Sequence, residues 1–240
     1  MAKTGFFHHI GTFLLFAATI LLLITTISSP VINSIGVMEV KLTNSTNGHN
    51  SVVKFGSFGY CIIHASGNKD YCTGKHIGYN PAQVMSGADK TDFNTASTDT
   101  TKALTRVMVL HPIACGLAFI AFLLAAGSGV IGAVGAALVT AVAWIVTIVV
   151  MCTDFVAFGI IKRHVDRDGS GSHAHYSTAM WTLVAAMICL FLAFFIVLLT
   201  CCSSRGHRQS HKMTWNGTST TPPTPKRQFW QRRSRFKMQQ

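Results

Sequence analysis

Cys61 and Cys72 have the spacing in this chain that most clearly indicates chemistry. Ten residues separate them, and glycine and aromatic residues surround both. They could form a disulfide, for which closing so short a loop contributes about 2–3 kcal/mol. Together with His64 and His76 they could instead supply the four ligands of a Cys2His2 zinc site. An oxidising compartment favours the disulfide, so the choice depends on which side of a membrane this segment occupies.

Four apolar stretches determine where the cysteines lie. A helix of about 20 residues, rising about 1.5 Å per residue, crosses the hydrocarbon core of a bilayer. The expected spans are residues 10–27, 107–126, 131–150 and 180–199. The apolar pattern of the third span continues beyond residue 150, as far as residue 161. A cleaved signal peptide is the alternative for the first stretch, but no small-residue cleavage site follows it, which favours a retained helix.

The charges that flank these spans predict their orientation. The segment Cys201–Gln240 carries nine Lys or Arg residues and no acid, within a net charge of +12. Because basic segments stay on the cytoplasmic side, we expect both termini in the cytoplasm and the two polar loops outside the cell. The connecting segments are then a cytoplasmic N-terminus (1–9), an extracellular loop (28–106), a cytoplasmic turn (127–130), a second extracellular loop (162–179) and a basic, disordered cytoplasmic tail (200–240).

The first loop has the composition of a small folded domain. Val37–Leu42 and Val52–Ile63 mix β-branched, aromatic and polar residues, which is typical of half-buried strands. Ser86–Thr101 is rich in Ser, Thr and Asp and predicts a flexible approach to the second span. Export favours the Cys61–Cys72 disulfide, with no metal and no other cofactor. The expected fold class is an all-α membrane protein, a four-transmembrane-helix bundle with a small disulfide-linked, partly β extracellular domain in the first loop.

Small residues recur at every fourth position at the start of the third span. Such residues let helix backbones approach closely in lipid, so we expect them to form a packing face. They are Ser128, Gly132 and Ala136 on one line and Gly129, Ala133 and Ala137 beside it. Asp154 lies further along the same helix. A charge inside a span would indicate a transport path, but this position favours an interfacial carboxylate that is exposed to water or paired with a neighbouring cation.

Histidines form another candidate group on the side expected to be extracellular. They are His49, His64, His76, His164, His173 and His175, with His111 near the same surface. Imidazole titrates between about pH 5 and about pH 8, so a cluster would respond to pH, whereas solvated loop histidines are the alternative. The sequence has no motif of a serine hydrolase, a zinc protease or a P-loop enzyme, and we expect no enzymatic activity.

Two kinds of covalent modification are predicted. Asn44 begins an Asn-Ser-Thr sequon on the side expected to be extracellular, where N-glycosylation occurs. Cys201 and Cys202 follow the fourth span, a position typical of S-palmitoylation, although an unmodified pair is equally compatible with the sequence.

The tail carries two basic clusters. The first contains Arg205, Arg208 and Lys212, and the second contains Lys226, Arg227, Arg232, Arg233, Arg235 and Lys237. Prolines between them predict no stable helix through residues 203–225. Aromatic residues interleave with the second cluster, which favours contact with the anionic inner leaflet or an acidic partner rather than with nucleic acid. The alternative is that the charges only fix topology.

The motif around the two cysteines resembles the fungal PalI-type tetraspan family over about residues 5–200. The residues that carry the resemblance are Ser29 and Pro30 after the first span, Gly56, Phe58, Gly59 and Tyr60 before Cys61, and Gly78 and Tyr79 after Cys72. The chain is more distantly similar to claudins, but it lacks the tryptophan-rich stretch that claudins have before the first cysteine.

That resemblance implies a function. The family contains the ambient-pH signalling membrane protein PalI and the tetraspans of eisosome membrane compartments. It implies a non-enzymatic accessory or scaffold protein of the plasma membrane that assists a membrane sensor in alkaline-pH signalling. The alternatives are an organiser of eisosome-type microdomains and the cell-wall-linked cortex, and a claudin-like adhesion protein. The implied partners are other membrane proteins, either a pH sensor or an eisosome component, and an oligomer is compatible with this role.

Overall fold

The computed structural model describes residues 6–43, 51–65, 69–89, 92–127 and 130–213. The chain divides into one unit of Met1–Ser203 and another of Ser204–Gln240, and the sheet and the packed helices belong to the first unit. The helices are α1 (Phe6–Thr26), α2 (Pro81–Asp89), α3 (Thr95–Val107), α4 (Leu110–Ala126), α5 (Val130–Val165) and α6 (Thr178–Met213). The strands are β1 (Met38–Lys41), β2 (Val52–Phe55), β3 (Tyr60–Ala65), β4 (Lys69–Cys72) and β5 (His173–Tyr176).

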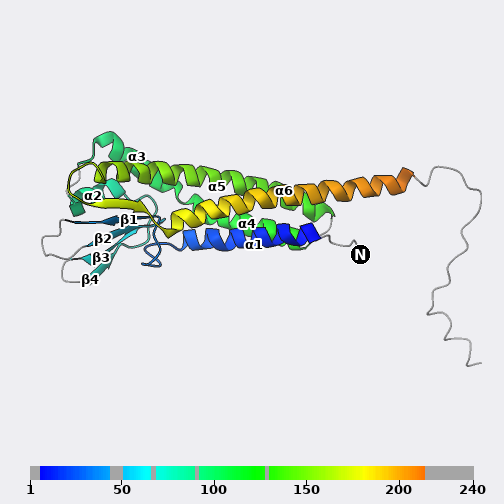
Figure 1. Cartoon of the computed structure of the whole chain (residues 1–240), viewed down its shortest axis with the longest axis horizontal. Helices are drawn as coiled ribbons and strands as arrows, with labels where there is room; N and C mark the ends of the chain where they lie inside the picture. The colour runs from blue at the N-terminus through cyan, green and yellow to red at the C-terminus, as the bar shows by residue number, and fades with distance from the viewer. Residues whose placement is uncertain (1–5, 44–50, 66–68, 90–91, 128–129, 214–240) are drawn as a thin grey trace, which may run out of the picture. The chain divides into compact units, whose positions relative to one another are not determined.

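Among the residues that the structure describes, four helices are long and apolar enough to cross a membrane, in agreement with the four spans predicted. The first and last of these segments are His8–Thr26 and Thr178–Thr200. Large side chains such as Phe13, Leu138 and Leu199 are more than half exposed on the helices, as lipid-facing residues are. The chain is therefore a multi-pass membrane protein whose helices run side by side, with a small sheet at one end of them (Figure 1).

The helices differ from the predicted spans at their ends. α5 continues to Val165, beyond the predicted extension to residue 161. α6 continues to Met213, so the prediction of no helix between 203 and 225 is wrong for its first residues. Ser86–Thr101 is not a flexible approach, because α2 ends at Asp89 and α3 begins at Thr95 with its N-terminus capped by the Asn94 side chain.

The sheet combines both of the predicted outer loops. Its strand order is β4-β3-β2-β1-β5, all antiparallel, with β5 contributed by the second loop. The run Val52–Ile63 forms a hairpin rather than one strand, because the chain reverses between Phe55 and Tyr60. Alternate residues such as Val53 and Phe55 are buried, which gives the sheet one apolar face.

α5 connects the sheet to the helices because it is longer than a membrane requires. Its 36 residues span about 54 Å, against about 30 Å for the hydrocarbon core. Its last turns place Phe158, Ile161 and Val165 in one buried cluster with Met38 and Phe55 of the sheet. The sheet therefore packs on the end of a membrane helix and is not an independent domain on a linker.

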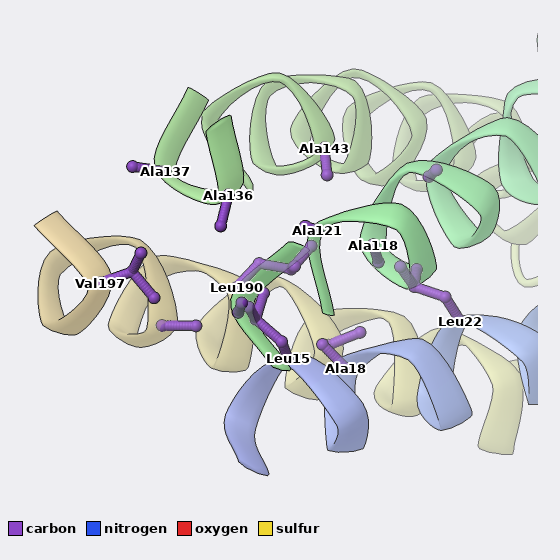
Figure 2. Close-up of a cluster of buried hydrophobic side chains, with 14 of the residues drawn as sticks. Leu15, Ala18, Leu22, Ala118, Ala121, Ala136, Ala137, Ala143, Leu190 and Val197 are labelled. Atoms are coloured by element: carbon purple, nitrogen blue, oxygen red, sulfur yellow. The ribbon is translucent and has the colours of Figure 1, made fainter. Parts of the chain in front are cut away.

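A second buried cluster lies between the four helices. Leu15 and Leu22 of α1 and Leu190 of α6 meet alanines of α4 and α5 in this cluster (Figure 2). Alanines allow the helix backbones to approach, and a Cβ atom at Gly132 would lie 3.2 Å from the carbonyl oxygen of Leu124 on α4. Of the predicted packing residues, Ala136 and Ala137 are buried in this cluster, Gly132 and Ala133 are half-buried, and Ser128 and Gly129 lie outside the described residues.

Candidate functional site

The disulfide predicted between Cys61 and Cys72 is confirmed. The two residues lie directly opposite each other on β3 and β4. Because both sulfur atoms are used in this bond, the alternative zinc site with His64 and His76 is wrong. Asn33 Oδ1 lies 3.5 and 3.4 Å from the two sulfur atoms, so the disulfide is also packed against the segment that follows α1.

The glycine-rich turn between β2 and β3 packs on the end of α1. A side chain at Gly56 would overlap the backbone of Ser29. The next residue, Ser57, donates its backbone N–H to Ser28 Oγ at 3.1 Å and its hydroxyl to the Thr25 carbonyl oxygen at 3.0 Å. These groups are buried, so the turn satisfies backbone and hydroxyl groups at the end of the first span.

Tyr79 lies at the centre of the junction between the sheet and the helices. Its hydroxyl donates to the Gly56 carbonyl oxygen at 2.8 Å, and its own carbonyl oxygen accepts from Thr105 Oγ1 at 2.6 Å. Its ring stacks with Phe55 at a centroid distance of 6.2 Å, and Phe55 also meets Phe158 of α5 at 6.1 Å. Burial first, and the charge of Asp154 second, raise the pKa of Tyr79 well above its ordinary value, so the phenol stays neutral.

The other residues of the motif are distributed around this junction. Gly59 and Gly78 have φ values of +157° and +77°, which favour glycine, and Gly78 leaves room for the Arg106 side chain. Tyr60 is half-buried, with its ring 6.2 Å from those of Phe55 and Tyr79. The Phe58 carbonyl oxygen accepts from the His76 backbone N–H at 3.1 Å. The motif therefore builds the junction, and the hydroxyl group of Tyr79 donates to a backbone oxygen instead of pointing into a cleft.

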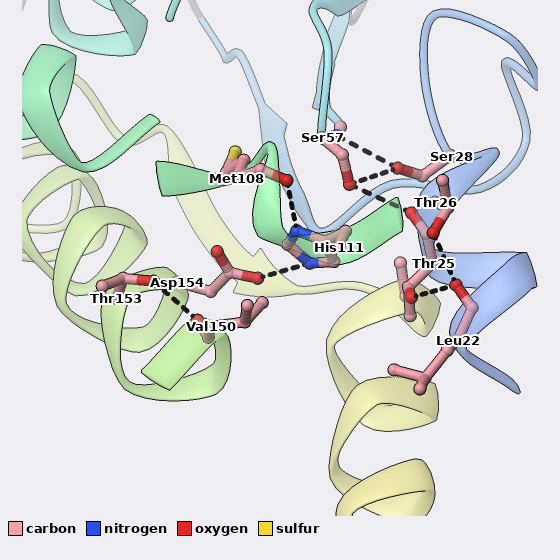
Figure 3. A network of polar contacts seen from close by, with 12 residues as sticks. Leu22, Thr25, Thr26, Ser28, Ser57, Met108, His111, Val150, Thr153 and Asp154 are labelled. Carbon is pink, nitrogen blue, oxygen red and sulfur yellow. Dashed lines mark hydrogen bonds and ion pairs between the residues drawn. The ribbon is translucent and has the colours of Figure 1, made fainter. Parts of the chain in front are cut away.

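Beside this junction, His111 of α4 faces Asp154 of α5 (Figure 3). His111 Nε2 lies 3.1 Å from Asp154 Oδ2, and each side chain is only 1% exposed. The other ring nitrogen, Nδ1, lies 2.9 Å from the Met108 carbonyl oxygen. The interpretation of Asp154 as an interfacial carboxylate exposed to water is therefore wrong, because packing between helices encloses it. Its partner is a histidine of the neighbouring span.

One signal for this pair was present in the sequence. His111 is the only Asp, Glu, Lys, Arg or His between residues 107 and 126, and Asp154 is the only one between 131 and 161. Ionisable groups inside spans usually face another span and find a partner there. That rule identifies the two residues as partners once α4 and α5 are known to be neighbours. The sequence alone does not show that these two helices are neighbours.

The candidate histidines that the structure describes lie on several different elements. His64 and His76 are exposed, while His164 packs its ring on Phe93 at 4.8 Å. His175 is exposed on β5, with Nε2 4.0 Å from Glu39 Oε1. His173 is exposed on the same strand, and His49 lies outside the described residues. Among the described residues no group of three or more His, Cys, Asp or Glu side chains could hold a metal ion.

The segment after α5 is a hydrogen-bonded turn. Asp166 Oδ1 accepts from the Ala174 N–H at 3.1 Å, and Lys162 Nζ donates to the Ala174 carbonyl oxygen at 2.7 Å. Lys162 also donates to Asp166 Oδ2 at 2.7 Å. The end of α5 therefore binds the outer edge of β5, the strand that the sequence did not predict.

The remaining predicted sites fall outside the described side chains. They are the sequon at Asn44, the cysteines Cys201 and Cys202, and the basic residues Lys226, Arg227, Arg232, Arg233, Arg235 and Lys237. Their proposed roles in glycosylation, palmitoylation and lipid or partner binding stay predictions.

Four apolar helices, with a disulfide-linked sheet built from both loops at one end of the bundle, define a tetraspan membrane protein. Comparison with known proteins then identifies its family. The chain belongs to the SUR7/PalI family, whose sequence profile matches residues 7–193.

A curated relative is the pH-response regulator protein palI/RIM9 of Emericella nidulans. The two chains are 36% identical over 118 residues, which cover 49% of this chain. The matched part is only 18% of the relative, so most of that longer protein has no counterpart in the alignment.

Proposed function

We propose that this chain is a non-enzymatic scaffold of the plasma membrane that assists a separate membrane sensor in the response to alkaline pH. The observation that carries this proposal is the 36% identity to a pH-response regulator within a family match that covers most of the chain. The relative's name assigns it to the pH response, and this chain takes the same general role through the 118-residue segment that the two proteins share.

The geometry of the junction supports a scaffold rather than an enzyme. Its hydroxyl groups, on Ser57, Tyr79 and Thr105, donate to backbone carbonyl oxygens and serve the fold. A nucleophile would need a free hydroxyl beside a base, within a space for substrate. A rigid, disulfide-linked sheet on top of a helix bundle instead suits the presentation of a surface to another membrane protein.

The proposed topology places the sheet outside the cell and both termini in the cytoplasm. The disulfide supports this arrangement, because such bonds persist in oxidising compartments. The nine basic residues after Cys201 support it independently, through the positive-inside tendency of multi-pass proteins.

Complementation tests the proposal. The chain is expressed in an Emericella nidulans strain that lacks palI/RIM9, both alone and in place of the matched segment of the longer protein. Restored growth at alkaline pH by the chimera is the expected result, and a constitutively processed transcription factor of the pathway should bypass the need for it. The variant Gly56→Val, in which a side chain overlaps Ser29, should fail, whereas Gly74→Ala, with open space around it, should complement.

Imaging of a fluorescently tagged form of this chain distinguishes the pH role from a second role, the organisation of eisosome-type membrane microdomains. A pH accessory should be needed for the sensor to reach the cell surface. Stable patches together with eisosome proteins, without any effect on alkaline growth, would contradict the pH role and favour the organisation of membrane microdomains.

A further inference from the structure

The hydrogen positions of the His111–Asp154 pair follow from its surroundings. His111 Nδ1 lies 2.9 Å from the Met108 carbonyl oxygen, and a carbonyl oxygen can only accept, so Nδ1 carries a hydrogen. His111 Nε2 and Asp154 Oδ2 lie 3.1 Å apart, and both are lone-pair atoms when deprotonated. Their contact is attractive only if one proton lies between them.

That single proton determines the charge of the pair. Whether it sits on the imidazole or on the carboxyl group, the pair as a whole is neutral. Without the proton, a neutral imidazole presents a lone pair to a carboxylate, and a net negative charge stays enclosed. Both side chains are 1% exposed, so water cannot solvate that charge without movement of the helices.

No other described group is placed to take over the role of this proton. The ionisable residues of α1 are His8 and His9, which lie in its first turn, at the end away from Thr26. Between Thr178 and Thr200, the only ionisable residue of α6 is Cys189. Cys115 and Cys152 are the other ionisable side chains of α4 and of α5 before Lys162, and neither is cationic.

The elements next to the sheet contribute no buried cation either. Lys102 and Arg106 of α3 are exposed. A phenol is never cationic, and burial together with the charge of Asp154 raises the pKa of Tyr79, so this side chain stays neutral. Among the described residues, the neighbourhood of the pair therefore holds no charged side chain that could offset a deprotonated pair.

We propose that His111 and Asp154 form a proton-binding site that holds α4 against α5 and releases this contact when alkaline pH removes the proton. Both helices of this pair are connected to the sheet, so a loss of the α4–α5 contact would also affect the sheet. α4 is preceded by α3, whose Thr105 holds Tyr79, and α5 carries Phe158 into the cluster under the sheet. The proposal adds a proton-linked element to the proposed function and rests on that function only for its biological purpose.

Distance measurements on the whole chain in lipid nanodiscs test the release. Spin labels at Ile113 of α4 and Val156 of α5 flank the pair at half-exposed positions, in a background that keeps Cys61 and Cys72 as the only other cysteines. When His111 and Asp154 are both present, the distribution of distances between the two labels should change from narrow to broad between about pH 6 and about pH 10. The variant Asp154→Asn should stay narrow throughout, because its amide N–H donates to the Nε2 lone pair of a neutral imidazole.

Matched controls separate this effect from general alkaline damage. Tyr79→Phe removes a second titratable group, whose pKa burial and the charge of Asp154 raise, and it should keep the alkaline broadening. In parallel, the melting temperature of the wild-type chain should fall by about 5 °C or more across the same pH range, and that of Asp154→Asn should change much less. A distribution that is unchanged in the wild type, or that broadens equally in Asp154→Asn, would overturn the proposal.

A spectroscopic readout covers the case in which Asp154→Asn does not fold. In wild-type protein with ¹³C-labelled histidine, the His111 resonance, assigned by its loss in His111→Gln, should shift as the proton leaves. A His111 resonance that stays constant between about pH 6 and about pH 10 also overturns the proposal. Complementation is a separate measurement, so a failure of the proton site leaves the accessory role standing, and the reverse also holds.

Discussion

Gly56 in the β2–β3 turn lies directly against the backbone of Ser29, at the end of the first span, with no room for a side chain between them. This contact joins the sheet to α1, and the neighbouring Ser57 adds two buried hydrogen bonds to the same helix end. Gly56 is thus required because two backbone segments approach closely here, and not because of an unusual φ value.

We predict that Gly56→Ala destabilises the protein by about 1–3 kcal/mol or more, because either the turn or the end of α1 must move. The measurement is thermal or denaturant unfolding in detergent, followed by circular dichroism. Gly74→Ala is the matched control, since a Cβ atom there meets nothing within 4 Å, and its effect should be within about 0.5 kcal/mol. Equal stability of the two variants would contradict a close-packing role for Gly56.

Loss of the disulfide should destabilise the sheet. We predict that Cys61→Ser combined with Cys72→Ser costs about 2–3 kcal/mol, because the unfolded chain loses a short closed loop. In cells this should appear as retention in the secretory pathway. Cys152→Ser, at an exposed free cysteine, should be neutral. Maleimide labelling under denaturing conditions checks the premise, and free thiols at both positions in surface-delivered protein would refute it.

The contact between α5 and β5 predicts a pH dependence in acid. Burial alone would raise the pKa of Asp166, but hydrogen bonds from Lys162 and the Ala174 N–H, with the charges of Lys162 and His173, lower it overall. A carboxyl group with a lowered pKa stabilises the fold above its unfolded value of about 3.9. That contribution disappears as pH falls through the lowered native pKa.

Asp166→Asn should therefore reduce stability near neutral pH by no more than about 1 kcal/mol, because the Lys162–Asp166 pair is partly exposed and screened by solvent. The two proteins should become equally stable in acid. Unfolding curves at a series of pH values measure this, with Asp99→Asn, an exposed carboxylate on α3, as the charge-matched control. A stability difference that grows as pH falls would have the wrong sign.

The parts of the fold that the sequence predicted are those specified by local signals. Apolar length alone identifies the four spans, and the spacing of Cys61 and Cys72 in a polar loop predicts their bond. β1 was recognisable from its β-branched and apolar residues. Each of these signals is contained within a short stretch of chain.

The parts that the sequence missed depend on distant neighbours. β5 consists of only four residues, HAHY, and becomes a strand because β1, far away in the sequence, pairs with it. α3 is rich in threonine, which has modest helix propensity, and it forms where Asn94 caps it and Thr101 and Thr105 are buried. The His111–Asp154 contact requires α4 and α5 to lie side by side, which hydropathy does not specify.

The topology can be tested with the two sequons of the chain. Asn44 should be glycosylated, and Asn216, which begins Asn-Gly-Thr in the tail, should not. Treatment with a glycosidase should increase gel mobility in the wild type and in Asn216→Gln, but not in Asn44→Gln. A shift that survives Asn44→Gln and disappears in Asn216→Gln would reverse the proposed orientation.

The final prediction concerns the second basic cluster, Lys226, Arg227, Arg232, Arg233, Arg235 and Lys237. These residues lie too far beyond the last span to be needed for fixing its orientation, and three aromatic residues, Phe229, Trp230 and Phe236, interleave with them. Each basic residue near an anionic leaflet contributes about 1 kcal/mol, and aromatic rings insert at the interface. We therefore expect a peptide of residues 203–240 to bind liposomes that contain phosphatidylserine.

Salt and charge should both control that binding. Rising ionic strength should release the peptide because it screens the attraction, and phosphorylation at Ser219, Thr220, Thr221, Thr224 or Ser234 should weaken binding by adding negative charge. Flotation with neutral and anionic liposomes measures the effect. Replacing the six basic residues of the second cluster by Gln should abolish most binding, whereas replacing Arg205, Arg208 and Lys212 should reduce it less. Equal binding to both kinds of liposome, or full binding by the Gln variant of the second cluster, would mean that these charges do not contact the membrane.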